Sequence, residues 1–216
     1  MMNFETILIY VTALLFSFML HEIGHAQMAY IRGDDTAKNM GRITLNPIPH
    51  IDIFGSLIFP AILLLTKAPI LFAWAKPVII NYSKLKNPKF DIPLVSFAGP
   101  FVHVILIALS LIIMKGALSF PQLTFGLNMS ILEFFTVMIQ VNVILMVFNL
   151  MPIPPLDGSK IIACLLPDEM ARKYMELNPN IGFILIILFA MSGFFGSILN
   201  YVFTFINRIA FVFLYR

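Results

Sequence analysis

Two histidines and a glutamate, His21, Glu22 and His25, interrupt a stretch of apolar residues near the start of the chain. Their spacing is His-Glu-x-x-His, and residues four apart lie on one face of a helix, one above the other. Both imidazoles can therefore bind one metal ion, with the carboxylate of Glu22 beside it. Ionisable side chains are costly at membrane depth, so their presence there indicates function. The spacing predicts a metal site in the first helix.

A catalytic zinc site usually has three protein ligands and one open position for water. The candidates for the third ligand in or beside apolar segments are His50, Asp52, His103, Glu133 and Asp157. Asp157 is favoured because it follows a proline-broken helix end, and irregular backbone at membrane depth occurs only where it is buried in protein or lines a cavity. A turn at Leu-Asp-Gly is the alternative interpretation of Asp157. Asp52 is interpreted as a cap, His50 as a loop or capping residue, and His103 as a polar group bonded between helices.

The composition is that of a membrane protein. Of the 216 residues, 60% are hydrophobic and 12% are charged, whereas a soluble domain has about 25% charged residues. The mean hydropathy of +0.93 agrees with this. Basic residues are scattered among the apolar runs, so nothing indicates binding to nucleic acid. One cysteine excludes an internal disulfide.

The hydrophobic pattern predicts an all-α polytopic membrane protein with about four to five membrane helices. Three core helices are expected at residues 4–31, 92–114 and 131–151. Residues 181–214 form either one long kinked helix or a hairpin, because Ser192-Gly193 interrupts an otherwise apolar run. We expect residues 1–216 to form a single membrane-embedded domain.

Residues 51–80 are ambiguous because Gly55 and Pro60 interrupt short apolar runs that are more typical of re-entrant elements. If Asp157 shares a metal with His25, these residues cannot cross the membrane once, so a re-entrant or hairpin element is expected there. Most of the 14 lysines and arginines then lie on the side of the site: Arg32, Lys38, Arg42, Lys67, Lys76, Lys84, Lys86, Lys89, Lys160, Arg172 and Lys173. Since positive residues favour the cytoplasm, the active site should open toward the cytoplasm.

Several motifs together resemble one family. The first-helix His-Glu-x-x-His motif, Asn46-Pro47-x-Pro49-His50, Ala98-Gly99-Pro100 and the run from Asn149 to Gly158 are similar to motifs of the site-2 protease family, which are intramembrane zinc metalloproteases. The chain resembles its compact prokaryotic members, without a PDZ or CBS-like domain. One departure is His103, where relatives often have asparagine.

The resemblance implies roles for individual residues. His21, His25 and Asp157 would bind one Zn²⁺, and Glu22 would be the catalytic base. Zinc would supply Lewis-acid activation of the scissile carbonyl and of water. Asn149 is a candidate donor to the developing oxyanion, and an interhelical hydrogen bond is its alternative role.

The expected function is that of an intramembrane zinc endopeptidase in regulated proteolysis. Its substrates would be membrane-spanning proteins cut within or near the membrane, where a helix must be unwound before attack. The 51–80 element could hold an extended substrate by strand addition. The expected location is the inner membrane of a prokaryotic cell, in contact with lipid. A membrane zinc transporter, for which no internal repeat is visible, and a non-catalytic scaffold are the alternatives.

Overall fold

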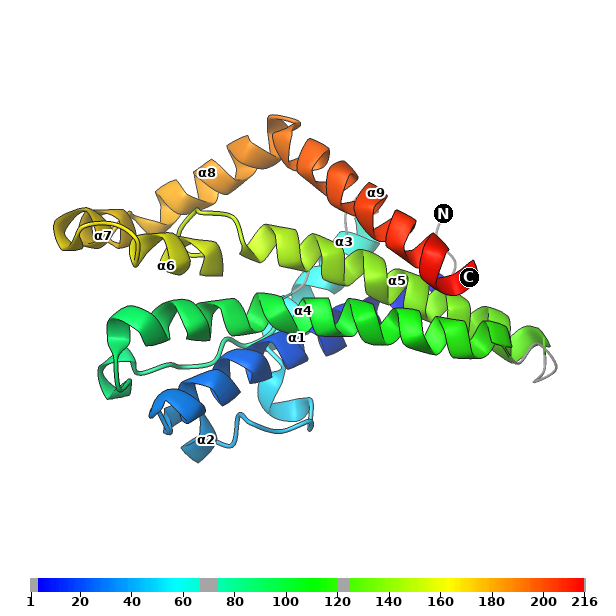
Figure 1. Ribbon diagram of the computed structural model, residues 1–216, viewed down its shortest axis with the longest axis horizontal. Coiled ribbons are helices and arrows are strands. Elements are labelled where there is room, and N and C mark those ends of the chain that lie inside the picture. Colours follow the sequence, from blue (N-terminus) through cyan, green and yellow to red (C-terminus); the bar gives the residue numbers. More distant parts are fainter. Residues whose placement is uncertain (1–3, 67–73, 120–124, 216) are drawn as a thin grey trace. The chain divides into compact units, whose positions relative to one another are not determined.

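The computed structural model describes residues 4–66, 74–119 and 125–215, and these contain nine α-helices and no strand (Figure 1). The helices are α1 (Phe4–Arg32), α2 (Thr36–Asn39), α3 (Phe59–Leu65), α4 (Pro88–Ser119), α5 (Phe125–Asn149), α6 (Asp157–Ala163), α7 (Asp168–Met175), α8 (Pro179–Met191) and α9 (Phe194–Tyr215). The predicted all-α class is confirmed.

In the part of the chain that the structure describes, four helices are long and apolar enough to cross a membrane: Glu5–Arg32, Pro88–Ser119, Ser130–Asn149 and Phe194–Tyr215. The first three correspond to the predicted helices 4–31, 92–114 and 131–151. α4 begins four residues earlier than predicted because Pro88 suits the first position of a helix, where no N–H is needed. The chain is thus a multi-pass membrane protein.

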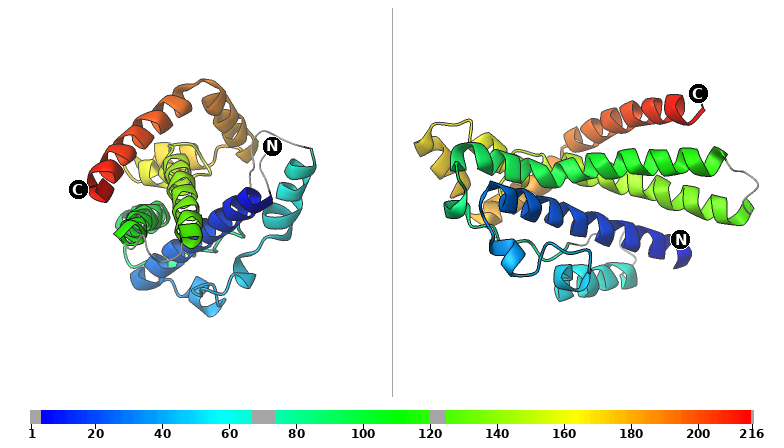
Figure 2. Two further views of the ribbon diagram at one scale, coloured as in Figure 1. Left: turned by 90° about the vertical axis from the view of Figure 1, so that its right-hand side faces the viewer. Right: turned by 60° about the horizontal axis from the view of Figure 1, so that its bottom comes forward.

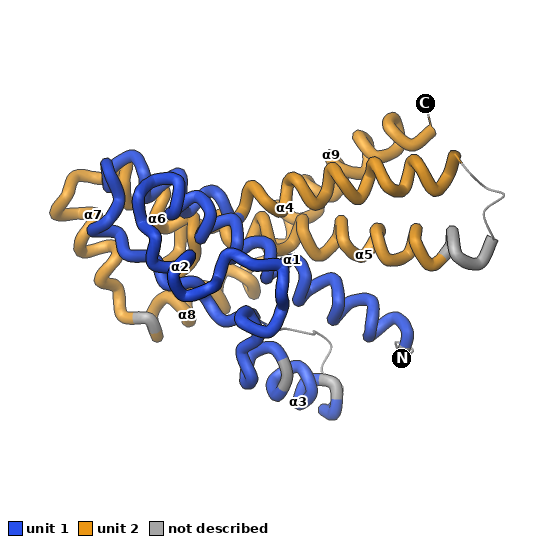
Figure 3. Tube along the Cα trace, turned by 90° about the horizontal axis from the view of Figure 1, so that it is seen from below, with its two compact units in different colours: residues 1–99 blue, residues 100–216 orange. Residues whose placement is uncertain are grey.

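The chain forms two compact units, residues 1–99 and residues 100–216, and α4 passes from the first to the second (Figure 3). The first unit has a small core in which Ala29 of α1, Leu85 and Val95 pack together. Met28, Ile80 and Ile92 cover this core. The core joins the C-terminal end of α1 to the beginning of α4. A single domain over residues 1–216 stays a prediction.

The segment 51–80 returns on itself within the first unit. Its first part forms a π-helical turn, η2 (Ile53–Ile58), followed by α3. The Trp74 N–H donates to the Gly55 carbonyl at 3.1 Å, and the Ser56 hydroxyl donates to the Trp74 carbonyl at 2.8 Å. The two ends therefore lie side by side, as the predicted hairpin requires, and its apolar helix, Ile53–Leu63, is too short to cross a membrane. Residues 67–73 lie outside the described residues.

The core of the second unit is built from three helices. Ile107 and Leu111 of α4 pack against Ile139 and Val143 of α5, and α9 covers them with Val202, Phe203, Ile206 and Ala210. In both views of Figure 2 α9 (red) is inclined to α5 (yellow-green), and the two helices are in contact. Within this unit the fully buried His103 ring bonds the Asn142 side chain at 2.7 Å. His103 is thus a polar group bonded between helices, as predicted.

The alternatives for residues 181–214 are resolved by a break at Ser192-Gly193. α8 ends at Met191 and α9 begins at Phe194, and the two meet at a sharp bend (Figure 1). Gly193 has a φ of 74°, a left-handed conformation that glycine adopts without a steric penalty. The segment is therefore two helices and not one.

Candidate metal centre

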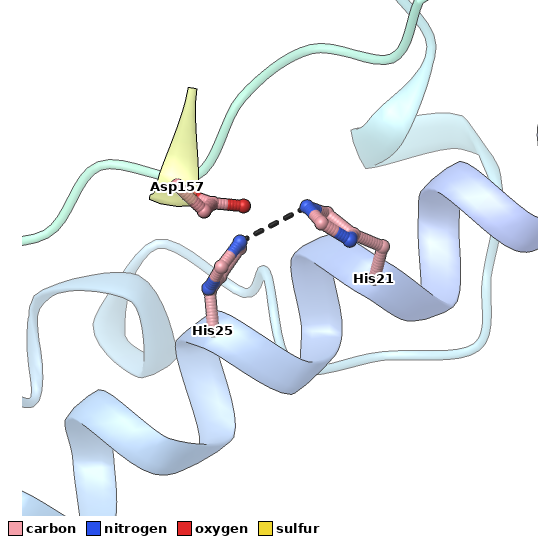
Figure 4. A group of neighbouring side chains, drawn as sticks. All are labelled: His21, His25 and Asp157. Carbon is pink, nitrogen blue, oxygen red and sulfur yellow. Dashed lines mark hydrogen bonds between the residues drawn. The ribbon is translucent and has the colours of Figure 1, made fainter. Parts of the chain in front are cut away.

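The side chains of His21 and His25 meet on one face of α1 (Figure 4). Their Nε2 atoms are 3.0 Å apart, and the two rings stand edge to face with centroids 4.5 Å apart. Both side chains are buried. The i, i+4 spacing thus produces the predicted convergence of two imidazole nitrogens within one helix.

A backbone carbonyl fixes the orientation of His25. Its Nδ1 atom lies 2.7 Å from the Val95 carbonyl oxygen. Because a carbonyl only accepts hydrogen bonds, Nδ1 carries the proton and Nε2 keeps its lone pair for a metal. Such a bond to the second nitrogen is the usual support of a histidine ligand. Tetrahedral zinc with Zn–N bonds of about 2.05 Å would separate two ligand nitrogens by about 3.3 Å. The observed pair fits zinc with a small adjustment.

Gly99 gives these imidazoles their space. A Cβ atom built on Gly99 would lie 2.4 Å from the His25 Nε2 atom and 2.6 Å from the His21 Cε1 atom. Any larger residue at this position would displace the rings. In the sequence Ala98-Gly99-Pro100 is visible as part of a family motif and as a close-packing kink; the structure adds that a side chain at Gly99 would occupy the space of the two rings.

Glu22, the predicted base, accepts a hydrogen bond from outside its own helix. The Val78 N–H donates to the Glu22 Oε2 atom at 2.6 Å. Val78 belongs to the non-helical stretch at the end of the 51–80 segment. Its part in the site was missed in the sequence because a backbone N–H has no residue signature.

Asp157 lies in the second unit, at the first residue of α6, and is buried (Figure 4). Its Oδ1 atom accepts a hydrogen bond from the Lys160 ammonium at 3.0 Å, one turn further along α6. The next residue, Gly158, packs so closely on the end of α5 that a Cβ there would lie 2.2 Å from the Leu150 carbonyl oxygen. The start of α6 is therefore fixed against the end of α5.

The proline segment before Asp157 is also held in place within the second unit. The Tyr174 hydroxyl of α7 donates to the Pro152 carbonyl at 2.6 Å. Gly182 of α8 lies so close to the Pro154 carbonyl oxygen that a Cβ would come within 2.1 Å of it. These contacts position the irregular backbone that leads to Asp157.

The other candidate ligands, and the candidate oxyanion donor Asn149, make contacts that do not involve His21 or His25. Asp52 accepts a hydrogen bond from the Gly55 N–H at 2.6 Å and caps η2, as predicted. The His50 ring bonds the Thr44 carbonyl at 3.1 Å, and burial lowers the pKa of His50, which keeps the ring neutral. Glu133 is exposed on α5. The Asn149 amide donates to the Leu145 carbonyl of its own helix at 3.0 Å.

Two known proteins are similar to the chain over most of its length. It is 40% identical over 180 residues to "Putative zinc metalloprotease YwhC" of Bacillus subtilis (strain 168), covering 82% of this chain and 78% of that protein. It is 28% identical over 178 residues to "Putative zinc metalloprotease Rip2" of Mycolicibacterium smegmatis, covering 82% of this chain and 64% of that protein. No family model matches the chain. No solved structure matches it either.

Proposed function

The chain belongs to a family of zinc metalloproteases, so its cofactor is zinc and its reaction is the hydrolysis of peptide bonds, and from this premise we propose that it is an intramembrane endopeptidase of the site-2 protease type. The observation that supports this most is the position of the His21 and His25 pair. Both imidazoles are buried in α1, a helix long and apolar enough to cross a membrane. A metal held there would act at membrane depth.

We propose that His21, His25 and Asp157 hold the zinc ion. Two neutral imidazoles and one carboxylate are a usual ligand set for a catalytic zinc, and a fourth position stays open. The orientation of His25 by Val95 and the buried, fixed start of α6 support this assignment. Zinc bound there would supply a Lewis acid for a peptide carbonyl and for water.

Glu22 is the proposed general base. It follows His21 directly, and its Oε2 atom is held by the Val78 N–H. Its second oxygen takes a proton from the attacking water and then passes that proton to the leaving amine. Asn149 is the proposed donor to the oxyanion; one of its two amide hydrogens bonds Leu145, and the other stays available for this role.

The proposed substrates are membrane-spanning segments of other proteins, cut within or near the lipid. A substrate helix hides its peptide bonds in i to i−4 hydrogen bonds, so helix-breaking residues near the cut should favour cleavage. The active site is proposed to open toward the cytoplasm, because most lysines and arginines then lie on the cytoplasmic side.

The function is tested by reconstituting the protein in vesicles with a membrane-spanning reporter. Wild type should cleave the reporter, while Glu22→Gln should bind zinc equally and cleave at least about 100-fold more slowly, since general-base catalysis contributes that much. Replacing the helix-breaking residues of the reporter by leucine should protect it. A Glu22→Gln protein that cleaves as fast as wild type would contradict the proposal.

A further inference from the structure

We propose that Arg42 is a positioning residue for the base Glu22 and acts through the backbone of Lys76, Pro77 and Val78. The inference rests on the proposed function in one respect, the role of Glu22 as the base. The chain of contacts itself lies entirely within the first unit.

The last contact in this chain joins Val78 to Glu22. A single backbone N–H holds Oε2 at 2.6 Å, and it comes from a residue 56 positions along the sequence. A long carboxylate side chain has several rotamers, and a hydrogen bond to one oxygen selects among them. Because Val78 is not part of α1, the bond orients Glu22 only if the backbone at Val78 is itself fixed.

Arg42 fixes that backbone from the two preceding residues. One Nη atom donates to the Lys76 carbonyl at 2.5 Å, and the other is 3.4 Å from the Pro77 carbonyl. Arg42 is only 4% exposed. A buried guanidinium is always charged and requires acceptors, and its planar fork matches two neighbouring carbonyls better than an ammonium does. The ring of Pro77 further restricts the backbone immediately before Val78.

The same stretch is held on either side of these contacts. The Lys76 N–H donates to the His50 carbonyl at 2.9 Å, and the Asn81 N–H donates to the Asp34 carboxylate at 2.7 Å. The bond to Glu22 therefore lies in the middle of a backbone segment that is anchored at both ends. Among these anchors Arg42 contacts the two residues that precede Val78. Replacing Arg42 should therefore disturb the hydrogen bond from Val78 to Glu22 more than replacing the other anchors would.

The consequence is a defect in turnover with intact metal binding. Neither Arg42 nor Val78 contacts His21 or His25 through a described hydrogen bond, so zinc affinity should be unchanged. Loss of the orienting bond should lower kcat about 10- to 100-fold, the usual effect of losing an outer-shell hydrogen bond, with KM changed less than threefold.

The experiment uses two matched pairs of variants in reconstituted full-length protein. Val78→Pro removes the N–H, and Val78→Ala keeps it. Arg42→Gln removes the charge, and Arg42→Lys keeps the charge with a single donor group. We expect kcat to fall in Val78→Pro and Arg42→Gln, to fall much less in Val78→Ala than in Val78→Pro, and to be partly restored in Arg42→Lys. The double variant Arg42→Gln with Val78→Pro should be no slower than Val78→Pro alone, because both changes break the same contact.

Zinc content is measured on every sample, and kcat is expressed per zinc-loaded molecule, so misfolded protein does not count as a defect in turnover. If Val78→Pro does not fold, the Arg42 pair decides the matter. Equal kcat in Val78→Pro and Val78→Ala would overturn the proposal. It would also be overturned if the fold-reductions in kcat of Arg42→Gln and Val78→Pro multiplied in the double variant.

Hydrogen–deuterium exchange separates this proposal from the proposed function. The amide of Val78 should be protected in wild type and should exchange at least tenfold faster in Glu22→Ala, whether or not any reporter is cleaved. A wild type that cleaves no reporter would contradict the function alone. An amide whose exchange is the same in both proteins would contradict the contact and with it the role of Arg42.

Discussion

Gly99 lies so close to His25 that a Cβ atom on it would be 2.4 Å from the His25 Nε2 atom. Gly99→Ala must therefore move an imidazole nitrogen that is proposed to bind zinc. We expect the affinity for zinc to fall about 10- to 100-fold, as it does when the orientation of a ligand is lost. Competition with a chromophoric chelator measures this affinity. Gly116→Ala, on the same helix with open space around it, is the control and should bind zinc like wild type.

The hairpin of residues 51–80 depends on a second close approach. A Cβ atom on Gly55 would lie 2.2 Å from the Trp74 ring, so Gly55→Ala should separate the two ends of the hairpin at a cost of about 1–3 kcal/mol. Trp74 is the single tryptophan of the chain, so its fluorescence reports the change directly. Gly196→Ala is the control, because a Cβ atom there would meet no atom within 4 Å, and an emission spectrum of Gly55→Ala identical to that of Gly196→Ala would show that the hairpin does not need this contact.

Asp34 should make the protein sensitive to acid. Burial raises the pKa of its carboxyl, but hydrogen bonds from Thr36 and Asn81 outweigh burial and hold the pKa below 3.8. A group with a lowered pKa in the folded state stabilises the protein above its unfolded pKa of about 3.9, and this stabilisation is lost as the pH falls through the folded value. Below about pH 4 the wild-type protein should therefore unfold at a lower temperature than it does near neutral pH. Asp34→Asn should be less stable near neutral pH and should show a smaller acid-induced change. Equal pH dependence in the two proteins would exclude this role of Asp34.

The proposed orientation predicts which loops face the cytoplasm. In a Cys164→Ser background, a cysteine at Lys86 should be cytoplasmic and a cysteine at Lys115 should be outside. A membrane-impermeant maleimide added to intact cells should label the second and not the first. The opposite pattern would place the active site on the outer side.

The sequence was sufficient for features that repeat along the chain or use distinctive residue types. Helix periodicity and hydrophobic length predicted α1, α4 and α5, and the His-Glu-x-x-His spacing predicted that His21 and His25 would meet. The requirement that residues 51–80 do not cross the membrane once predicted the hairpin there, which the bond from Trp74 to Gly55 supports.

Other features depend on tertiary contacts between backbone groups or on the absence of a side chain. The Val95 carbonyl that orients His25 and the Val78 N–H that holds Glu22 belong to residues whose type says nothing about these bonds. Gly99 belonged to a visible motif, but its partner became clear only when α4 was placed beside α1 in the first unit. The break between α8 and α9 depended on whether Gly193 would adopt a positive φ, which the sequence permits and does not require.

The most direct test of the account is the zinc affinity of Asp157→Ala compared with Asp52→Ala. Asp157 is the proposed third ligand, whereas Asp52 caps a turn of the hairpin. We expect Asp157→Ala to bind zinc more than about 100-fold more weakly than wild type, because even outer-shell changes cost 10- to 100-fold. Asp52→Ala should bind zinc as wild type does. An Asp157→Ala protein with wild-type zinc affinity would contradict the proposed centre.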